Sequence, residues 1–174
     1  MKRLIPFVLA MFPALASAQS GHFDNTPIRS FDLSEYLGTW YEIARFDHSF
    51  ERGMEGVTAE YSLRDDGRVD VINSGWKDGN YKVANGKARQ REPMENPAHL
   101  EVSFFLFFYS DYNVMMLDDM YRVALVGSGS PGYLWILSRT PQIDESTKNA
   151  ILKEAQRRGY DTSGLIWVNQ DRNM

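Results

Sequence analysis

Eight short β-rich segments, each followed by turn-forming residues, are the feature that most restricts how this chain of 174 residues can fold. The expected strands are 39–47, 57–63, 68–74, 81–91, 99–105, 113–117, 121–126 and 133–138. The breaks between them are rich in glycine, aspartate, asparagine and proline, as in RDDGR, KDGN and GSGSPG. Short turns between successive strands predict an antiparallel meander. Closing eight strands removes the exposed sheet edges, so we predict an all-β fold, an eight-stranded antiparallel up-and-down β-barrel.

One segment, DESTKNAILKEAQRR at 144–158, has helical periodicity instead. Its apolar stripe consists of Ala150, Ile151, Leu152 and Ala155. Charged residues surround this stripe, which predicts a single amphipathic α-helix. Asp144 or Ser146 can cap its start, and Gly159 can end it. A short final strand is expected at 165–168.

The N-terminus has the pattern of a secretory signal peptide. Lys2 and Arg3 precede the apolar run LIPFVLAMFPALA, which leads into a small-residue motif ending at Ala18. The run is too short and wrongly flanked for a membrane-spanning helix. We therefore predict a signal peptide over 1–18, cleaved after Ala18 and followed by an N-terminal arm at 19–31.

The chain contains no cysteine. This excludes disulfides, thiolate nucleophiles and thiolate metal sites, and it removes the acceptor for a bacterial lipid anchor at the cleavage site. We therefore expect a soluble protein in the periplasm, with secretion as the alternative. Loss of Lys2 and Arg3 leaves 17 of the 19 basic residues against 23 acidic ones, so nucleic acid is not an expected partner.

Period-two alternation divides each expected strand into an inward and an outward face. The inward set mixes large aromatic side chains with small residues such as Gly86 and Ala88. This mixture can leave space in a barrel that is wide enough for one small ligand, although a packed core is the alternative. An apolar lining with few polar groups suits an acyl chain whose polar head meets donors near the mouth. The residues expected to contact the ligand are Tyr61, Val71, Asn73, Val102, Phe104, Tyr112, Val114, Met116, Tyr133 and Trp135. Ala44, Val123 and Leu125 are also expected to point inward.

Several longer blocks carry a family resemblance. They are YLGTWYEIARFDHSFERG, VTAEYSLRDDG, VDVINSGW, LEVSFFLFFYSDYNVMMLD, YRVALVGS and YLWILSRTP, followed by the helix and IWVNQ. In this order they resemble the lipocalin family and, within it, the bacterial Blc-like group. The resemblance covers 32–170, the expected lipocalin domain. It implies a barrel with one C-terminal α-helix packed on its side and an internal pocket for small hydrophobic molecules.

The resemblance also implies structural roles for three residues. Gly38 and Trp40 match the first block of the family, and Arg139 matches the arginine of the third. In the family this arginine lies across the tryptophan and closes the barrel floor. The second block departs from the pattern, because LDDMY supplies Asp118 and Tyr121 without a tyrosine directly after the aspartate.

For the ligand, the resemblance implies fatty acids and lysophospholipids, with a role in storing or moving lipids for envelope maintenance. We therefore predict a lipid-binding carrier for transport or storage that is not an enzyme and uses no cofactor. No metal site is expected, because His22, His48 and His99 are widely separated in the sequence. A homodimer stays open, since some members of the group dimerise.

Two alternative functions also stay open. Glu42 falls on the inward phase of its strand, where a weak esterase or lysolipid hydrolase could use a carboxylate. The segment FFLFFYSDY holds more aromatic residues than one inward face can use, so Phe105, Phe107 and Phe108 are expected at the rim or outside. Such a rim is typical of a membrane- or protein-interaction module, and transient membrane contact fits lipid exchange. The loop FDHSFERGMEG is expected to cover part of the barrel mouth.

Overall fold

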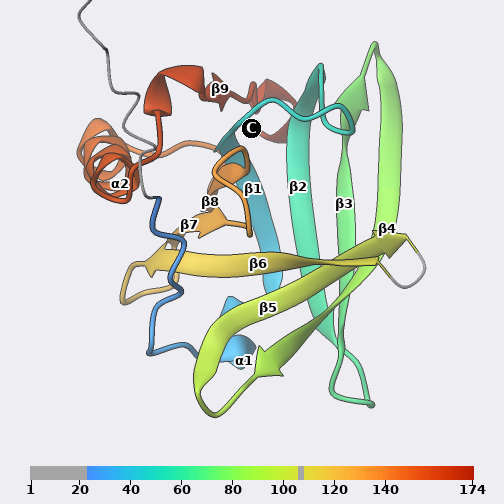
Figure 1. Ribbon diagram of the computed structural model, residues 1–174. Helices are drawn as coiled ribbons and strands as arrows, with labels where there is room; N and C mark the ends of the chain where they lie inside the picture. The colour runs from blue at the N-terminus through green and yellow to red at the C-terminus, as the bar shows by residue number, and fades with distance from the viewer. Residues whose placement is uncertain (1–22, 106–107) are drawn as a thin grey trace, which may run out of the picture.

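The chain forms a closed antiparallel β-barrel with one long helix against its side (Figure 1). The structure, a computed structural model, describes residues 23–105 and 108–174. The barrel strands are β1 (Gly38–Arg45), β2 (Met54–Leu63), β3 (Val69–Lys77), β4 (Asn80–Glu92), β5 (Asn96–Phe105), β6 (Phe108–Leu117), β7 (Val123–Gly127) and β8 (Leu134–Ser138). Each strand pairs with the next, and β1 closes the barrel by pairing with both β2 and β8. The predicted fold class is therefore confirmed.

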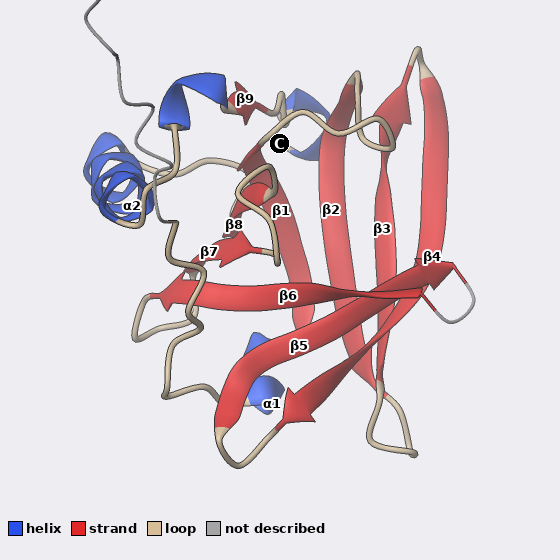
Figure 2. Cartoon of the chain, in the orientation of Figure 1, coloured by secondary structure: helices blue, strands red, loops and turns tan. Residues whose placement is uncertain are grey.

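The remaining elements lie around this wall of strands, as Figure 2 shows. They are α1 (Leu33–Tyr36), α2 (Glu145–Arg157), the short 3-10 helices η1 (Thr162–Gly164) and η2 (Asp171–Asn173), and a two-residue strand β9 (Ile166–Trp167) that pairs with β1. The Asp144 side chain caps α2 by accepting a backbone N–H. Ile151 and Ala155 of α2 are buried in one cluster with Met115 and Ile136 of the barrel wall. The predicted helix is thus confirmed, and its apolar stripe covers the outside of the barrel.

The two ends of the barrel differ. At one end β1 begins, β8 finishes, and α1 supplies Tyr36, which is fully buried together with Trp40. We call this the closed end. The opposite end carries the β1–β2 loop at 46–53, the β3–β4 turn and the β7–β8 loop at 128–133. We call it the open end.

A bulge in β1 decides which side chains of this strand enter the barrel. The register against β8 shifts between Glu42 and Ala44. Glu42 pairs with Leu137 and Arg45 pairs with Trp135, both members of the inner cluster, whereas Ala44 joins the cluster under α2. The expectation that Ala44 points inward is therefore wrong. The extra residue of a bulge shifts the alternation by one, so the next side chain changes face.

A second bulge corrects the predicted ligand contacts. The register of β6 against β7 shifts between Val114 and Met116, and both Met115 and Met116 pack in the cluster under α2. Met116 was expected inside and lies outside. Val123 and Leu125 of β7 belong to the same outer cluster, which overturns their expected inward orientation. Because α2 covers this part of the wall, both faces of β7 are apolar and alternation cannot tell them apart.

The C-terminal segment holds β1 and β2 together near the open end. Direct pairing of these two strands stops about half-way along β1. Beyond that point the Gln170 side-chain Nε2 donates to the carbonyl oxygens of Glu42, at 2.8 Å, and Val57, at 2.9 Å. The Val168 amide also donates to the Ile43 carbonyl at 2.9 Å. The segment therefore satisfies backbone groups that the separated strands leave unpaired.

Candidate functional site

The floor of the barrel is a packed aromatic and cationic contact. The Arg139 guanidinium carbon lies 3.9 Å from the centroid of the Trp40 ring. Its Nη1 and Nη2 atoms donate to the carbonyl oxygens of Thr39 and Glu35 at 2.9 and 2.8 Å. Gly38 has φ +92°, and a Cβ atom there would lie 3.4 Å from Arg139 Nη1. The backbone conformation therefore favours glycine, and the floor has no room for a ligand.

Three of the predicted ligand contacts belong to this packed region. Tyr61, Val71 and Val114 are 5%, 1% and 0% exposed and pack in one cluster with Trp40. Because protein already covers nearly all of their surface, these three residues belong to the packed core and leave little surface for a ligand.

A chain of three tyrosine hydroxyls marks the upper limit of the packed region. The Tyr112 hydroxyl lies 2.7 Å from that of Tyr36 and 2.9 Å from that of Tyr61. Burial raises the pKa of all three phenols, that of Tyr61 to about 12, so they stay neutral at physiological pH. The three hydroxyls therefore hydrogen-bond to one another inside an apolar barrel.

Above these hydroxyls, inward side chains remain accessible to solvent. Phe104 and Tyr133 are 43% and 39% exposed, and Val102 and Trp135 are only partly buried although they pack against the inner cluster. We call this region the upper interior; it consists of Asn73, Val102, Phe104, Tyr112, Tyr133 and Trp135. Inward apolar surface without protein neighbours is surface that a ligand can cover. These six predicted contacts are the ones that the structure brings together.

Gly86 makes the position of Phe104 possible. Gly86 pairs with the buried Val71, so its missing side chain would point inward. A Cβ atom at this position would lie 2.7 Å from the Phe104 ring, closer than such atoms approach in proteins. The Phe104 ring therefore lies against bare backbone of β4, which keeps it close to the wall.

Sequence reasoning missed a buried charged cluster at the open end. Arg45 Nη1 donates to Glu42 Oε1 at 2.6 Å, and Arg45 Nη2 donates to the carbonyl oxygens of Glu51 and Met54 at 2.7 and 3.2 Å. Trp135 Nε1 donates to Glu51 Oε2 at 3.1 Å. The three charged residues are at most 6% exposed. Glu42 was expected inside, but the bulge that turns Arg45 inward left no signal in the sequence.

Burial governs the electrostatics of this cluster. Burial, reinforced by the nearby Glu51 carboxylate, raises the pKa of Glu42 to about 8, although Arg45 opposes the shift. Burial also raises the pKa of Glu51, against the opposing effects of the Trp135 hydrogen bond and Arg45. Glu42 therefore keeps its proton at neutral pH.

Aromatic stacking also holds the β1–β2 loop against the open end. The His48 ring stacks 4.6 Å from Tyr133 and 5.2 Å from Phe50, and it lies 5.1 Å from Trp135. Burial, together with the positive charge of Arg45, lowers the pKa of His48, so the imidazole is neutral at pH 7. The loop thus covers part of the open end, while its Phe50 remains 62% exposed.

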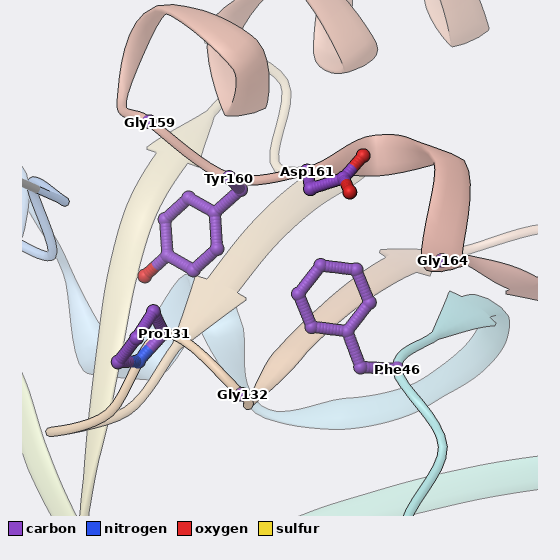
Figure 3. Close-up of a pocket in the computed structure, with 7 residues that line it drawn as sticks. All are labelled: Phe46, Pro131, Gly132, Gly159, Tyr160, Asp161 and Gly164. Atoms are coloured by element: carbon purple, nitrogen blue, oxygen red, sulfur yellow. The ribbon is translucent and has the colours of Figure 1, made fainter. Parts of the chain in front are cut away.

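A separate open hollow of about 410 Å³ lies outside the barrel, between the end of α2 and the β7–β8 loop. Figure 3 shows the rings of Phe46 and Tyr160 along its sides, with Pro131 below Tyr160. The Asp161 carboxylate accepts hydrogen bonds from the backbone and hydroxyl of Ser163, so it serves its own turn. None of the predicted ligand contacts lines this hollow.

Some expectations concern residues outside the described ranges. The signal peptide over 1–18, residues 19–22 of the N-terminal arm, which include His22, and Phe107 lie there. Within 23–105 and 108–174, no group of three or more His, Cys, Asp or Glu is placed to hold a metal ion. The helices in this part of the chain are too short or too polar to cross a membrane.

Comparison with known proteins assigns the family. A family model described as a lipocalin-like domain matches residues 31–170. The chain belongs to the lipocalin family. The outer membrane lipoprotein Blc of Escherichia coli (strain K12) is 49% identical over 174 residues, covering 97% of this chain and 98% of Blc. Apolipoprotein D of Bos taurus is 35% identical over 156 residues, covering 83% of this chain and 81% of that protein.

The fold also matches solved structures. Insecticyanin from the tobacco hornworm Manduca sexta superimposes with a TM-score of 0.69 at 22% identity, covering 84% of each chain. Together with the Blc similarity, family membership makes the chain a carrier that binds small hydrophobic ligands, as lipocalins typically do. The upper interior is the part of the barrel where inward side chains stay partly exposed.

Proposed function

We propose that this lipocalin carries one fatty acid or lysophospholipid in its upper interior and does not alter it chemically. The observation that carries the proposal is the set of inward-facing, mostly apolar side chains that protein covers only in part, above a packed floor. Each methylene buried there contributes about 0.8 kcal/mol before ordering costs, so a long acyl chain binds with few polar contacts.

A matched pair of charged substitutions tests this proposal. Phe104 and Val83 are similarly exposed, at 43% and 52%, but Phe104 faces inward and Val83 faces outward on β4. We expect Phe104→Asp to abolish palmitate binding, because a buried charge would face the acyl chain, and Val83→Asp to leave it unchanged. Titration followed by tryptophan fluorescence measures both. Equal binding by the two variants, or no acyl ligand bound by the delipidated wild type, contradicts the proposal.

We further propose that the protein works in the cell envelope, in lipid transport or storage. Similarity to a protein named an outer membrane lipoprotein supports this location. Since the chain has no cysteine, the acyl anchor implied by that name has no acceptor here. The processed protein is then free in the periplasm. N-terminal sequencing of the periplasmic fraction should read Gln19 first, whereas recovery only from detergent-treated membranes would contradict this location.

An aromatic rim at the open end supports transient membrane contact during lipid exchange. Phe50 and Phe108 are 62% and 75% exposed there. We expect Phe50→Ser with Phe108→Ser to reduce co-sedimentation with liposomes. Met94→Ser is the control, because Met94 is 89% exposed in the β4–β5 turn at the closed end. Unchanged co-sedimentation of the double variant would remove the rim from the proposal, and native mass spectrometry of the same samples tests whether the rim instead supports a homodimer.

A further inference from the structure

The carboxylate of Glu51 lies inside the barrel although the residue belongs to the β1–β2 loop. Glu51 is 6% exposed, and its Oε2 accepts the hydrogen bond from Trp135 Nε1 at 3.1 Å. Its backbone carbonyl accepts from Arg45 Nη2 at 2.7 Å. Arg45 and Trp135 are direct cross-strand partners on β1 and β8. A loop residue therefore occupies the place where a guanidinium and an indole N–H lie side by side on the inner wall.

This part of the wall still has a donor to spare. Arg45 is 1% exposed, and its Nε has no hydrogen-bond partner within the described residues. Its Nη1 and Nη2 atoms serve Glu42 and two backbone carbonyls. A buried charged donor without a partner is costly, so this position favours an anionic acceptor.

The Glu51 carboxylate is also held at an electrostatic cost. Burial raises its pKa, and its charge helps to raise the pKa of Glu42. Elsewhere in the loop, Asp47, Phe50, Arg52 and Gly53 are exposed. Besides Glu51, His48 is the loop residue that stacks against the upper interior. The loop can therefore give up the Glu51 contact without unfolding the wall.

We propose that Glu51 is an internal stand-in for the acidic group of the ligand. When an acyl lipid enters, its carboxylate or phosphate takes the donors of Trp135 and Arg45, and the Glu51 side chain leaves the barrel with its loop. The inference rests on the proposed function, since it requires the acyl chain to occupy the upper interior below these donors. It names the recognised chemistry as an anionic oxygen group, whether a fatty acid or a lysophospholipid supplies it.

The direction in which ligand affinity changes when Glu51 is replaced distinguishes this role from a structural one. A residue that only supports the site weakens binding when it is removed, whereas a competitor strengthens it. We expect Glu51→Ala to bind palmitate about tenfold more tightly relative to hexadecanol, which has the same chain without the charge. Glu51→Gln, which keeps the shape of the side chain, should shift binding in the same direction by less. Lysophosphatidic acid against monopalmitin makes the equivalent comparison for a phosphate.

Two further variants locate the effect. Asp47→Asn removes a negative charge from the same loop, but Asp47 is exposed and pairs with Arg52, so the ratio of palmitate to hexadecanol affinity should stay constant. Trp135→Phe in the Glu51→Ala background removes the indole donor and keeps a ring, and it should reverse most of the gain. Thermal unfolding of each variant confirms that it is folded.

The outcomes separate this inference from the proposed function. If Glu51→Ala binds only palmitate or only lysophosphatidic acid more tightly relative to its neutral counterpart, the proposal is supported, and the lipid that gains affinity identifies the source of the anion. Equal changes for charged and neutral ligands, or weaker palmitate binding by both Glu51 variants, overturn it while the proposed function stands. Failure of the wild type to bind even hexadecanol overturns the proposed function and this inference with it.

Discussion

The barrel uses an arginine and a tryptophan from the β1–β8 region twice, once at each end, with opposite results. At the closed end Trp40 lies near the start of β1 and Arg139 follows β8, and the two stack with the guanidinium carbon 3.9 Å from the ring centroid. At the open end Arg45 finishes β1 and Trp135 lies on β8, and the loop residue Glu51 accepts from both, through its backbone carbonyl from Arg45 and through its carboxylate from Trp135. The same two residue types therefore make a plug at one end and a polar site at the other.

The two ends differ in the hydrogen-bond partners of their arginine and tryptophan N–H groups. Arg139 donates to three backbone carbonyls, and Trp40 Nε1 donates to the Tyr36 carbonyl at 2.8 Å. Arg45 also donates to two backbone carbonyls, but its Nε has no partner among the residues that the structure describes, and Trp135 bonds to a side chain that belongs to a loop. Backbone acceptors are fixed by the fold, whereas a loop carboxylate can be exchanged for another anion. The donors at the closed end are thus fixed by backbone partners, and we propose that those at the open end exchange Glu51 for a ligand.

The largest effect should come from breaking the closed end. Trp40→Ala removes a fully buried indole from the packed floor and should reduce the free energy of unfolding by about 3–5 kcal/mol. Trp167→Ala is the control, since Trp167 is 43% exposed and its loss should cost about 1 kcal/mol or less. Chemical denaturation measures both variants. Similar losses would show that the floor does not carry the stability assigned to it.

The charged cluster at the open end should make stability depend on pH. The pKa of Glu42 is raised to about 8 in the folded protein from 4.5, so the folded state binds the extra proton and stability falls as pH rises between these values. His48, whose pKa is lowered, acts in the opposite direction only below about pH 6.5.

Melting temperatures measured between pH 6.5 and 8 separate the Glu42 effect from that of His48. Wild type should lose stability across this range, by at most about 1.4 kcal/mol per pH unit for one proton. Glu42→Gln should flatten the profile, and Glu60→Gln, an exposed outward residue, should not. A wild-type profile that is flat or rises would contradict the buried neutral carboxyl.

Substitutions in the upper interior should change ligand affinity much more than the free energy of unfolding. Phe104→Ala should weaken palmitate binding about tenfold, because an aromatic surface for the acyl chain is lost. It should change the free energy of unfolding by only about 0.5 kcal/mol, since the ring is 43% exposed. Calorimetric titration and denaturation separate the two quantities, with Val83→Ala as the outward control. A large stability loss would mean that Phe104 belongs to the core.

A substitution in the chain of tyrosine hydroxyls, between the packed floor and the upper interior, should have the smallest effect. Tyr112→Phe removes the hydroxyl that lies between those of Tyr36 and Tyr61, and it should cost about 1 kcal/mol of stability. Tyr81→Phe, at a residue that is 55% exposed, should cost nothing measurable. If Tyr112→Phe is equally silent, the hydroxyl chain does not hold the floor to the wall.

Much of the candidate site could be predicted from alternation along the strands. Tyr61, Val71 and Val114 point inward as the pattern indicates, and Phe104 and Trp135 do so as well. Which of these are packed and which are accessible could not be predicted, because exposure depends on how far α1 and the hydroxyl chain fill the barrel from below.

Two bulges account for the main errors. Met116 and Ala44 follow inward residues at regular spacing, yet each lies beyond a register shift and packs under α2. A bulge depends on how two strands fit together in space, so neither strand reveals it alone. The same shift brings Arg45 inside, which is why the buried cluster escaped sequence reasoning.

By itself the sequence determined the barrel, the long helix α2 and the family, because strand periodicity, turn residues and capping residues act over short stretches of chain. Only the tertiary structure decided the chemistry at the open end. Arg45, Glu51 and Trp135 meet there from one strand, one loop and a strand 90 residues away from the first. Whether a buried donor has a partner is a property of that three-dimensional meeting, and it distinguishes the end of the barrel that is closed from the end that is poised to bind.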